Sequence, residues 1–345
     1  MSKNFYKYIV IIFFVINFQN RSVAQDIHYT QYSFLPLLQN PSSVGFFDAQ
    51  MRFSGIYRNQ WVTVPVNYNS IGASFDINFL ENFKTGSKAG AGLNFYFDQA
   101  GDSKFQTLHL MVPLAYHFYI PISNHKLKFS IGAEAGFQYK SLSTADLYFD
   151  SQYNGEVFNP DANSEELFTN LTVFNPDFGG GINFEFETSQ EVKIGLGFAI
   201  KHLNEAKESY INSNIKPTLR KRFVVPVYFK IPISQSWDFE ANYLFNLQNN
   251  SQEHLAGVLF GYYLQNIGFF KKKINMGASY RFADAVSLIV QYETNNYKIG
   301  FSYDINTSKF IKATNSYGGI ELGFTYLIHN VLKPNMKFNK KCFTF

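Results

Sequence analysis

The sequence predicts an all-β protein: a transmembrane antiparallel β-barrel of about 14 strands with an N-terminal periplasmic or plug segment. Aromatic residues make up 19% of the 345 residues, with 39 Phe and 23 Tyr, whereas charged residues make up 16%. Mean hydropathy is nonetheless slightly negative at −0.15. Beyond residue 16, no run of ~18 apolar residues could cross a bilayer as a helix. Apolar residues that alternate with polar ones along strands explain both observations.

The first segment, residues 1–24, has the pattern of a secretory signal peptide. Two lysines precede an apolar run over 9–16, and small residues follow up to Ala24. This run is too short for a transmembrane anchor, which is the alternative interpretation. We therefore expect export across the inner membrane and a mature chain that begins at Gln25. Cleavage lowers the basic count from 30 to 27 against 26 acidic residues, a balance that suggests no nucleic-acid partner.

Alternation with a period of two is the strongest signal that follows. Over 297–304, Tyr, Ile, Phe and Tyr take one face, while Lys, Gly, Ser and Asp take the other. A helix would not distribute charges in this way. The pattern predicts an even number of strands, as bacterial barrels have, at 51–61, 66–80, 88–98, 106–120, 126–141, 177–187, 191–202, 221–233, 235–248, 253–264, 273–283, 285–294, 297–305 and 317–328.

The outward face of these strands favours a membrane barrel over a soluble β-sandwich or lipocalin-like barrel. Alternate residues over 127–139 form an apolar row with aromatic residues near both ends, as in a lipid-facing band between aromatic girdles. The predicted order is a plug or periplasmic segment over 25–50, the outer-membrane barrel over 51–328 and a basic periplasmic tail over 329–345.

Connection lengths agree with this orientation. If the N-terminus is periplasmic, the three longest connections, near 142–176, 203–220 and 306–316, all face outside. Barrels of this class keep periplasmic turns short and extracellular loops long.

The inward face carries a balanced set of charges, which argues against a charge-selective pore. We expect these side chains to pair across the lumen and with the N-terminal segment, giving a stiff or plugged barrel rather than an open channel. The predicted set comprises the basic residues Arg52, Arg58, Lys128, Lys193, Lys201, Arg222, Lys230, Arg281 and Lys298 and the acidic residues Asp76, Asp98, Glu134, Glu185, Glu187, Asp238, Glu240, Glu293, Asp304 and Glu321.

Catalysis finds little support in the sequence. His109 and His117 share the inward face of one strand, but strand rise puts them ~26 Å apart. The chain has no Gly-x-Ser-x-Gly elbow, no metal-spaced His or Cys cluster and no Gly-rich phosphate loop. We therefore predict no catalytic residue, cofactor or metal. The alternative is a barrel enzyme whose site assembles from distant strands.

Three motifs near the start of the mature chain carry a family resemblance. After Gln25-Asp26, the chain reads Asn40-Pro41-Ser42-Ser43-Val44-Gly45, and the first strand ends in Tyr57-Arg58-Asn59-Gln60-Trp61. The sequence resembles the PorP/SprF family of outer-membrane proteins, associated with the type IX secretion system and gliding motility of Bacteroidota. In that family a Gln-Asp start, Asn-Pro-Ala-x-x-Gly and Tyr-Arg-x-Gln-Trp follow at about these intervals. Ser42 departs from the pattern, and further matches lie at 277–281 and 300–304.

The motif residues have expected structural roles. Asn40-Pro41 followed by Gly45 should end an extended segment and turn it toward the barrel wall. Arg58 and Gln60 face inward, so Arg58 is expected to hold the N-terminal segment through charge-assisted bonds.

The remaining motif residues lie near strand ends or on later strands. Trp61 falls at a strand end, where an aromatic girdle would place it. Arg281 and Asp304, with Tyr303 beside it, lie on strands two apart, and we expect the two charges to pair structurally. The alternative interpretation of every motif is barrel architecture without direct partner contact.

The resemblance implies a non-enzymatic component of the type IX secretion and gliding machinery. Some members tie the outer membrane to the periplasmic ring, and others receive or anchor the C-terminal sorting domain of a secreted protein such as an adhesin. The implied partners are outer-membrane lipid and either periplasmic secretion components or a secreted surface protein. The sequence leaves this choice open, and the competing class is an outer-membrane transport channel for small or hydrophobic molecules.

If a secreted protein docks outside, the connection 142–176 is the candidate loop. Aromatic residues in an exposed loop suggest a binding surface; alternatively, they fold the loop over the barrel mouth. The aromatic residues in question are Tyr148, Phe149, Tyr153, Phe158 and Phe168.

Overall fold

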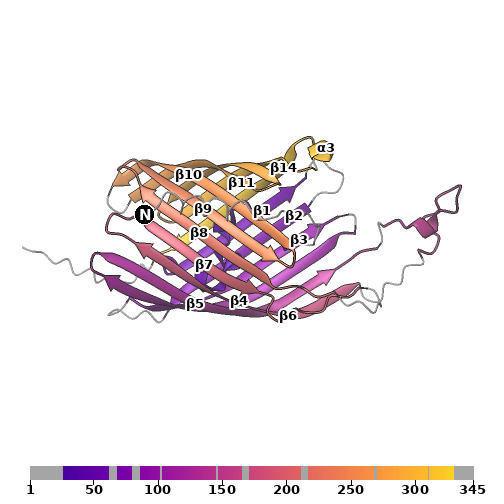
Figure 1. Ribbon diagram of the computed structural model, residues 1–345, viewed down its shortest axis with the longest axis horizontal. Coiled ribbons are helices and arrows are strands. Elements are labelled where there is room, and N and C mark those ends of the chain that lie inside the picture. The colour runs from indigo at the N-terminus through magenta and orange to yellow at the C-terminus, as the bar shows by residue number, and fades with distance from the viewer. Residues whose placement is uncertain are drawn as a thin grey trace, which may run out of the picture.

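Side chains that alternate between two faces form fourteen strands in the part of the chain that the computed structural model describes (Figure 1). The described residues are 26–61, 68–79, 86–101, 103–144, 147–164, 171–210, 217–267, 270–309 and 311–329. The strands are β1 (Met51–Gln60), β2 (Tyr68–Phe79), β3 (Lys88–Ala100), β4 (Phe105–Ile122), β5 (His125–Ser141), β6 (Thr172–Glu187), β7 (Lys193–Lys201), β8 (Arg222–Pro232), β9 (Trp237–Gln248), β10 (Ser251–Ile267), β11 (Phe270–Arg281), β12 (Ala285–Thr294), β13 (Tyr297–Asn306) and β14 (Tyr317–Ile328).

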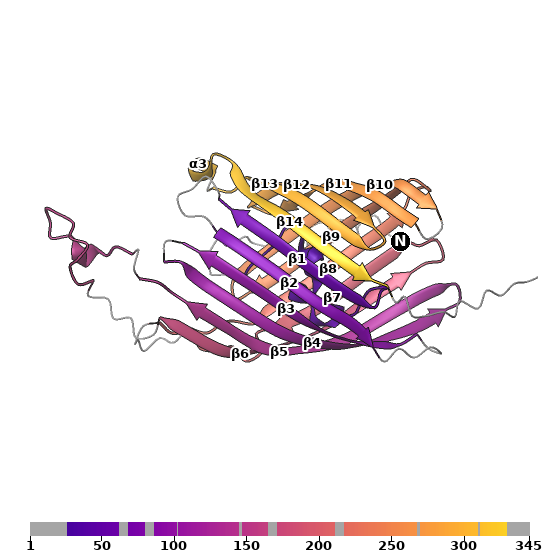
Figure 2. The same cartoon turned by 180° about the vertical axis from the view of Figure 1, so that it is seen from behind.

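Every strand pairs antiparallel with its neighbours in the chain, and the two terminal strands close the sheet into a barrel (Figures 1 and 2). At the closing seam, Met51 lies opposite Ile328 and Gln60 lies opposite Gly319. The all-β antiparallel barrel predicted from the alternation is therefore confirmed.

The helical elements are short. They are η1 (Tyr32–Phe34), α2 (Pro36–Gln39), η2 (Pro41–Ser43), η3 (Asp150–Gln152) and α3 (Ile311–Thr314). No helix among the described residues is long and apolar enough to span a membrane.

The clearest boundary difference is β6, which begins at Thr172 rather than at the predicted residue 177. Proline cannot donate a ladder hydrogen bond, which restricts where Pro176 can lie in the sheet. In the structure, β7 pairs with β6 only from Gly180 onward, so Pro176 lies where β6 extends past its neighbour. Proline is tolerated at such an edge.

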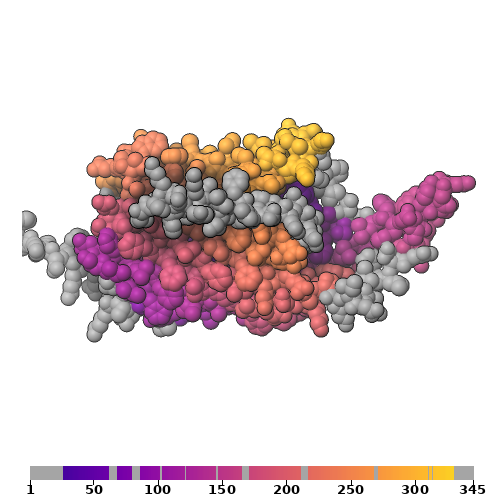
Figure 3. Space-filling model, viewed as in Figure 1, coloured from indigo at the N-terminus to yellow at the C-terminus, as the bar shows by residue number. Residues whose placement is uncertain are grey.

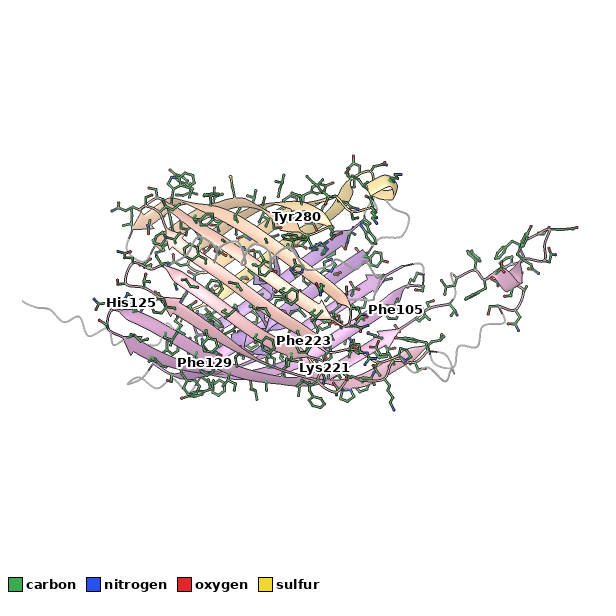
Figure 4. All side chains as sticks on the ribbon, in the orientation of Figure 1. Phe105, His125, Phe129, Lys221, Phe223 and Tyr280 are labelled. Carbon is green, nitrogen blue, oxygen red and sulfur yellow. The ribbon has the colours of Figure 1, made fainter. Side chains whose placement is uncertain are left out.

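The barrel wall separates an apolar exterior from a polar interior. Ile131, Leu114 and Leu288 are each more than half exposed on the outside. Figure 4 labels Phe129 and Tyr280 on the same outer surface of the wall. Polar and charged side chains occupy the alternate, buried positions. This arrangement is that of a barrel with lipid outside.

The two ends of the barrel differ in the length of their connections. We name the end that carries the longer ones the loop end; the three longest there are 142–171, 202–221 and 307–316. The opposite end, here the turn end, carries tight turns such as Asn295-Asn296. Residues 147–164, here the arm, project away from the loop end (magenta in Figures 1 and 3).

Candidate functional site: a lumen filled by the N-terminal segment

The described N-terminal residues 26–50, here the plug segment, run through the lumen from the loop end to the turn end. At the loop end, Asp26 N donates to Gln248 Oε1 at 3.0 Å, at the last residue of β9. At the turn end, Gln50 N donates to the carbonyl oxygen of Ile328 at 2.9 Å, at the last residue of β14. The segment therefore lies along the barrel axis before the chain enters β1.

Side chains of the plug segment pack into three small cores with the inner wall, and Tyr32 contacts the one formed by Ala199, Val224, Leu244 and Leu255. Phe34 and Leu35 lie with Ile56 and Tyr96 in one cluster, together with Tyr29 and Leu38. Leu37 and Val44 lie with Ala115 in another. Burying a side chain of this size contributes about 1.5–3 kcal/mol relative to exposure. The lumen thus provides the hydrophobic core that a short irregular segment cannot form alone.

Asn40 is the polar centre of the plug segment. Its Nδ2 donates to the carbonyl oxygen of Ile182 and to Asn183 Oδ1, both at 2.9 Å. Its Oδ1 accepts from Ser42 N at 3.0 Å and from Ser42 Oγ at 2.7 Å, which caps η2. Asn40 therefore fixes the turn at Pro41 and attaches it to β6 at the same time.

Glycines of the wall make room for this turn. A Cβ on Gly132 of β5 would lie 2.6 Å from Ser42 Cα, and a Cβ on Gly181 of β6 would overlap Asn40 Oδ1. Gly45, at the end of the motif, has φ +72°, a conformation that favours glycine. The turn at the Asn-Pro motif therefore packs directly against these wall glycines.

A charged network attaches the plug segment to the closing seam. Glu321 of β14 accepts from Thr30 N at 2.7 Å and from Gln31 N at 2.9 Å. Arg58 of β1 contacts Glu321 through Nη1 and Asp304 of β13 through Nη2, the latter at 2.9 Å. Glu321 thus joins both seam strands to the plug segment.

Thr30 is a second contact point in this network. Arg281 donates to Thr30 Oγ1 at 2.9 Å, and Arg58 does so at 3.3 Å. Arg281 also lies 3.8 Å from Asp304, so the structure brings together three of the motif residues named from the sequence.

Gln60 and Trp61 adjoin that network, and Tyr303 faces away from it. Gln60 and Trp61 line a cavity at the loop end, and Trp61 packs edge-on against Tyr68 at 4.8 Å between ring centroids. Tyr303 follows the alternation of β13 onto the outer face, where it lies opposite Leu288 of β12 and Ile320 of β14.

A cluster of acids and histidines at the loop end was not apparent in the sequence. His202, the residue after β7, lies 2.7 Å from Asp26 through Nε2 and 2.7 Å from Asp177 through Nδ1. His109 of β4 lies 2.7 Å from the same Asp177 oxygen. The four residues come from the plug segment and three separate strands or strand ends, so no spacing in the sequence marks them.

The electrostatics of this cluster favour a charged imidazole at His202. Burial alone would lower the pKa of His202, but the carboxylates of Asp26 and Asp177 outweigh it and raise the pKa to about 9. Burial would likewise raise the pKa of Asp26, yet His202 and Arg222 hold it well below its usual range. The pair ties the start of the plug segment to the wall.

His109, Asp177 and His202 offer ligand atoms within 4.8 Å of one another, the sole group of this kind within the described ranges. A metal would require neutral imidazoles. Because His202 is held between two carboxylates, its ring nitrogens act as donors to both of them. The arrangement serves an ion-pair network better than a metal centre.

His117, the second histidine considered as catalytic, lies elsewhere. Its Nε2 is 2.8 Å from the carbonyl oxygen of Val44, which attaches the plug segment near the turn end. His117 therefore contacts the plug segment directly, whereas His109 contacts Asp177 of the wall, and the two histidines do not form one site.

The arm is the longest described part of the predicted docking loop, 142–176. Gln152 is buried within it: its side chain accepts from Phe149 N at 2.9 Å and donates to the carbonyl oxygens of Pro160 at 3.0 Å and Ala162 at 2.9 Å. Tyr148 packs edge-on against Phe158 at 5.2 Å, and Tyr153 forms a bridge with Phe158. The arm projects from the barrel rather than folding over its mouth (Figures 1 and 2).

Three sequence predictions fall on residues outside the described ranges. They are the signal peptide at 1–24, all but the first residue of the tail at 329–345, and Phe168 of the docking loop.

Comparison with known proteins gives one family match. The model of the family described as type IX secretion system membrane protein PorP/SprF matches residues 22–326. No curated protein matches the chain.

Several solved barrels are similar in fold. The TodX deltaS2S3 mutant monoaromatic hydrocarbon channel is 9% identical, with a TM-score of 0.48 and coverage of 85% of this chain and 94% of its own. The Pseudomonas putida toluene transporter TodX is 10% identical, with a TM-score of 0.46 and coverage of 87% and 94%. A Pseudomonas aeruginosa FadL homologue is 10% identical, with a TM-score of 0.42 and coverage of 84% and 93%. These similarities carry nothing about what the present chain binds.

Proposed function

We propose, from the premise that the chain belongs to the PorP/SprF family of type IX secretion system membrane proteins, that it is a non-enzymatic docking barrel of the outer membrane. It receives or anchors the C-terminal sorting domain of a secreted surface protein, such as an adhesin of the gliding machinery. Its N-terminal signal peptide directs it across the inner membrane, and its loop end faces outside. Outer-membrane lipid surrounds its apolar wall.

The observation that carries this proposal is the occupied lumen. The plug segment is attached at both ends of the barrel and at its middle, by Asp26, Asn40 and Gln50. Eleven of its residues between Tyr29 and Val44 are less than 5% exposed, and they are Tyr29, Thr30, Gln31, Phe34, Leu35, Leu37, Leu38, Gln39, Asn40, Ser42 and Val44. A barrel filled in this way is better suited to present surfaces at its ends than to conduct solute.

The arm supplies the surface for docking. Tyr148 is 71% exposed and Tyr153 51% exposed, while Asp150, Glu156 and Asp161 are exposed beside them. Exposed aromatic residues are common anchors of protein interfaces, and the acidic neighbours favour a basic partner surface. The arm thus offers an aromatic and acidic surface to a secreted protein at the cell surface.

Affinity purification tests the proposal. The protein is tagged near its C-terminus, extracted from outer membranes in mild detergent, and compared with a variant that lacks residues 147–164. We expect the full chain to recover a large secreted protein through its C-terminal domain, and the arm deletion to lose it. Recovery of periplasmic ring components by both variants would instead assign the barrel to the ring-linking branch. Recovery of the barrel alone would contradict docking.

The alternative function, a transport channel for small or hydrophobic molecules, makes an opposite prediction. An open lumen would give stable single-channel conductance in planar bilayers, and deleting 147–164 would leave it unchanged. The plugged lumen predicts little conductance from the full chain. A barrel enzyme would require turnover on lipid or peptide that disappears when His109 is substituted.

A further inference from the structure

A cavity of about 470 Å³ lies at the loop-end mouth, and the plug segment forms one side of it. Asp26, Ile27 and His28 supply this side, and the ends of five strands with their adjoining turns supply the rest. These further lining residues are Arg58, Gln60, Trp61, Tyr68, Ser70, Asp98, Gln252, Glu253, Arg281, Phe282 and Asp284. Cavities of this volume are large enough to take a long side chain.

The positive charges that line the cavity are already neutralised. Arg58 is held by Asp304 and Glu321. Arg281 lies 3.2 Å from Glu253 through Nε and 2.9 Å from Asp284 through Nη1. Neither guanidinium is therefore available to an anionic ligand.

Asp98 of β3 is the carboxylate that lacks such compensation. It accepts from Ser70 Oγ at 2.5 Å. Within the described ranges, no basic side chain lies within 4.0 Å of it, whereas Asp26, Glu253 and Asp284 each have a cationic partner at that distance. The cavity therefore carries one carboxylate that has no cationic partner at ion-pair distance among the described residues.

Aromatic rings stand on the same side of the cavity as Asp98. Tyr68 begins β2, whose next residue, Asn69, lies opposite Gln99 of β3, so Tyr68 and Asp98 lie near each other at the strand ends. Trp61 packs edge-on against Tyr68. Rings next to a carboxylate are a recurrent arrangement for binding a cation, because the ring face is negative.

We propose that this mouth cavity binds a basic side chain of a polypeptide, an arginine guanidinium or lysine ammonium, with Asp98 as its counter-ion and Tyr68 and Trp61 as its aromatic wall. The inference rests on the proposed docking function and names the chemistry of the partner. The source is a polypeptide, because the cavity opens at the end of the barrel that bears the acidic arm. A partner with several basic residues can engage both surfaces.

Intrinsic fluorescence gives a direct measurement of this site. The chain has two tryptophans. Trp237 starts β9 at the turn end, so Trp237→Phe leaves Trp61 as the sole reporter, at the cavity. The full-length barrel in detergent is titrated with acetyl-Gly-Arg-Gly-amide, and with the same peptide carrying citrulline, which is neutral and nearly isosteric.

We expect the arginine peptide to change the Trp61 emission saturably and the citrulline peptide to do so at least tenfold more weakly. Asp98→Asn retains the Ser70 hydrogen bond and removes the charge. It should therefore lower the affinity for the arginine peptide about tenfold, as loss of one charge-assisted bond does. Asp161→Asn, on the arm, is the matched control and should leave affinity unchanged. Salt should weaken binding.

Equal binding of the two peptides, or unchanged affinity in Asp98→Asn, would overturn the proposal. If spermidine bound as tightly as the arginine peptide, the ligand would be a polyamine rather than a polypeptide, and the proposal would also be overturned. Because this assay uses the purified barrel, it tests the cavity separately from the docking function. Failure to recover a secreted protein, with peptide binding intact, would contradict the docking function. Recovery of a secreted protein without peptide binding would contradict only the proposed cavity site.

Discussion

The plug segment and the arm are both irregular, yet they are ordered by different means. In the plug segment, polar contacts run to the barrel wall, as when Asn40 donates to Ile182 and Glu321 accepts from Thr30. In the arm, the contacts of Gln152 run to Phe149, Pro160 and Ala162, all within the arm. Contacts with the barrel wall therefore determine the conformation of the plug segment, whereas contacts within the arm determine the conformation of the arm.

The plug segment and the closing seam share one buried carboxylate, that of Glu321. Glu321 and Arg58 come from the last and first strands, which meet only when the barrel closes. Thr30 and Gln31 bond to the same carboxylate. The stability of the seam and the stability of the plug segment are therefore coupled.

The largest effect is expected for Glu321→Ala. This substitution leaves Arg58 and two backbone N–H groups without their shared acceptor inside the lumen, and breaking a buried ion pair costs about 3–5 kcal/mol. Heat-modifiable migration on gels should show the barrel opening at a clearly lower temperature. Lys126→Ala is the control, because Lys126 is largely exposed and lies 3.9 Å from Glu187, a pair worth less than ~1 kcal/mol. If the Glu321→Ala and Lys126→Ala barrels opened at the same temperature, the coupling of seam and plug segment would be contradicted.

The second effect is a dependence on pH at the start of the plug segment. The pKa of His202 is raised to about 9 from an ordinary value of 6.5. A raised pKa stabilises the folded state fully below pH 6.5, and this stabilisation is lost as pH rises through about 9. The total loss is on the order of 3 kcal/mol. We expect the opening temperature to fall between pH 7 and pH 10.

His202→Asn provides the matched comparison for that measurement. Asn tolerates the left-handed backbone that His202 adopts, with φ 57°, and it does not titrate. The variant should open at a lower temperature than the parent at pH 7 and should show a smaller change between pH 7 and pH 10. An undiminished change would mean that other groups cause the dependence.

The sequence predicted the barrel well because alternation is a local property. A period of two identifies strands and assigns Arg58, Asp304 and Glu321 to the inward face without reference to any distant residue. It predicted an apolar outside and a paired lumen for the same reason.

The contacts across the lumen were beyond this reasoning. Which inward residues meet depends on the register of all the strands and on barrel closure, so the meeting of Asp26, Asp177 and His202 has no sequence signature. The role of Gly181 has no sequence signature either. It is one glycine in a glycine-rich strand, and only the structure shows that it packs against Asn40. The Asn-Pro motif indicated a turn, but not the wall that receives it.

A third, smaller effect tests this fit between turn and wall. Gly181→Ala places a methyl group against Asn40 Oδ1 and 2.9 Å from the carbonyl oxygen of Phe198. Overpacking of this kind costs about 1–3 kcal/mol, so the opening temperature should fall and protease access to the plug segment should rise. In Gly180→Ala, the nearest neighbour of the Cβ within the described ranges is the carbonyl oxygen of Gly132 at 3.6 Å, an ordinary contact. Similar behaviour of the two variants would show that the turn can shift in the lumen.

The smallest effect on the barrel is expected for Gln152→Ala, which tests the other side of the comparison. Removing the side chain leaves Phe149 N and two carbonyl groups without their partner, which costs about 1–3 kcal/mol locally. The arm should then be cut faster by protease between 147 and 164, while the opening temperature of the barrel stays within the change caused by an ordinary surface substitution, about ±0.5 kcal/mol. Ser151→Ala, which removes one exposed hydrogen bond to the carbonyl oxygen of Ser164, is the control. A lower barrel midpoint in Gln152→Ala would mean that the arm and the wall stabilise each other, and that the arm's conformation, like that of the plug segment, depends on the closed barrel.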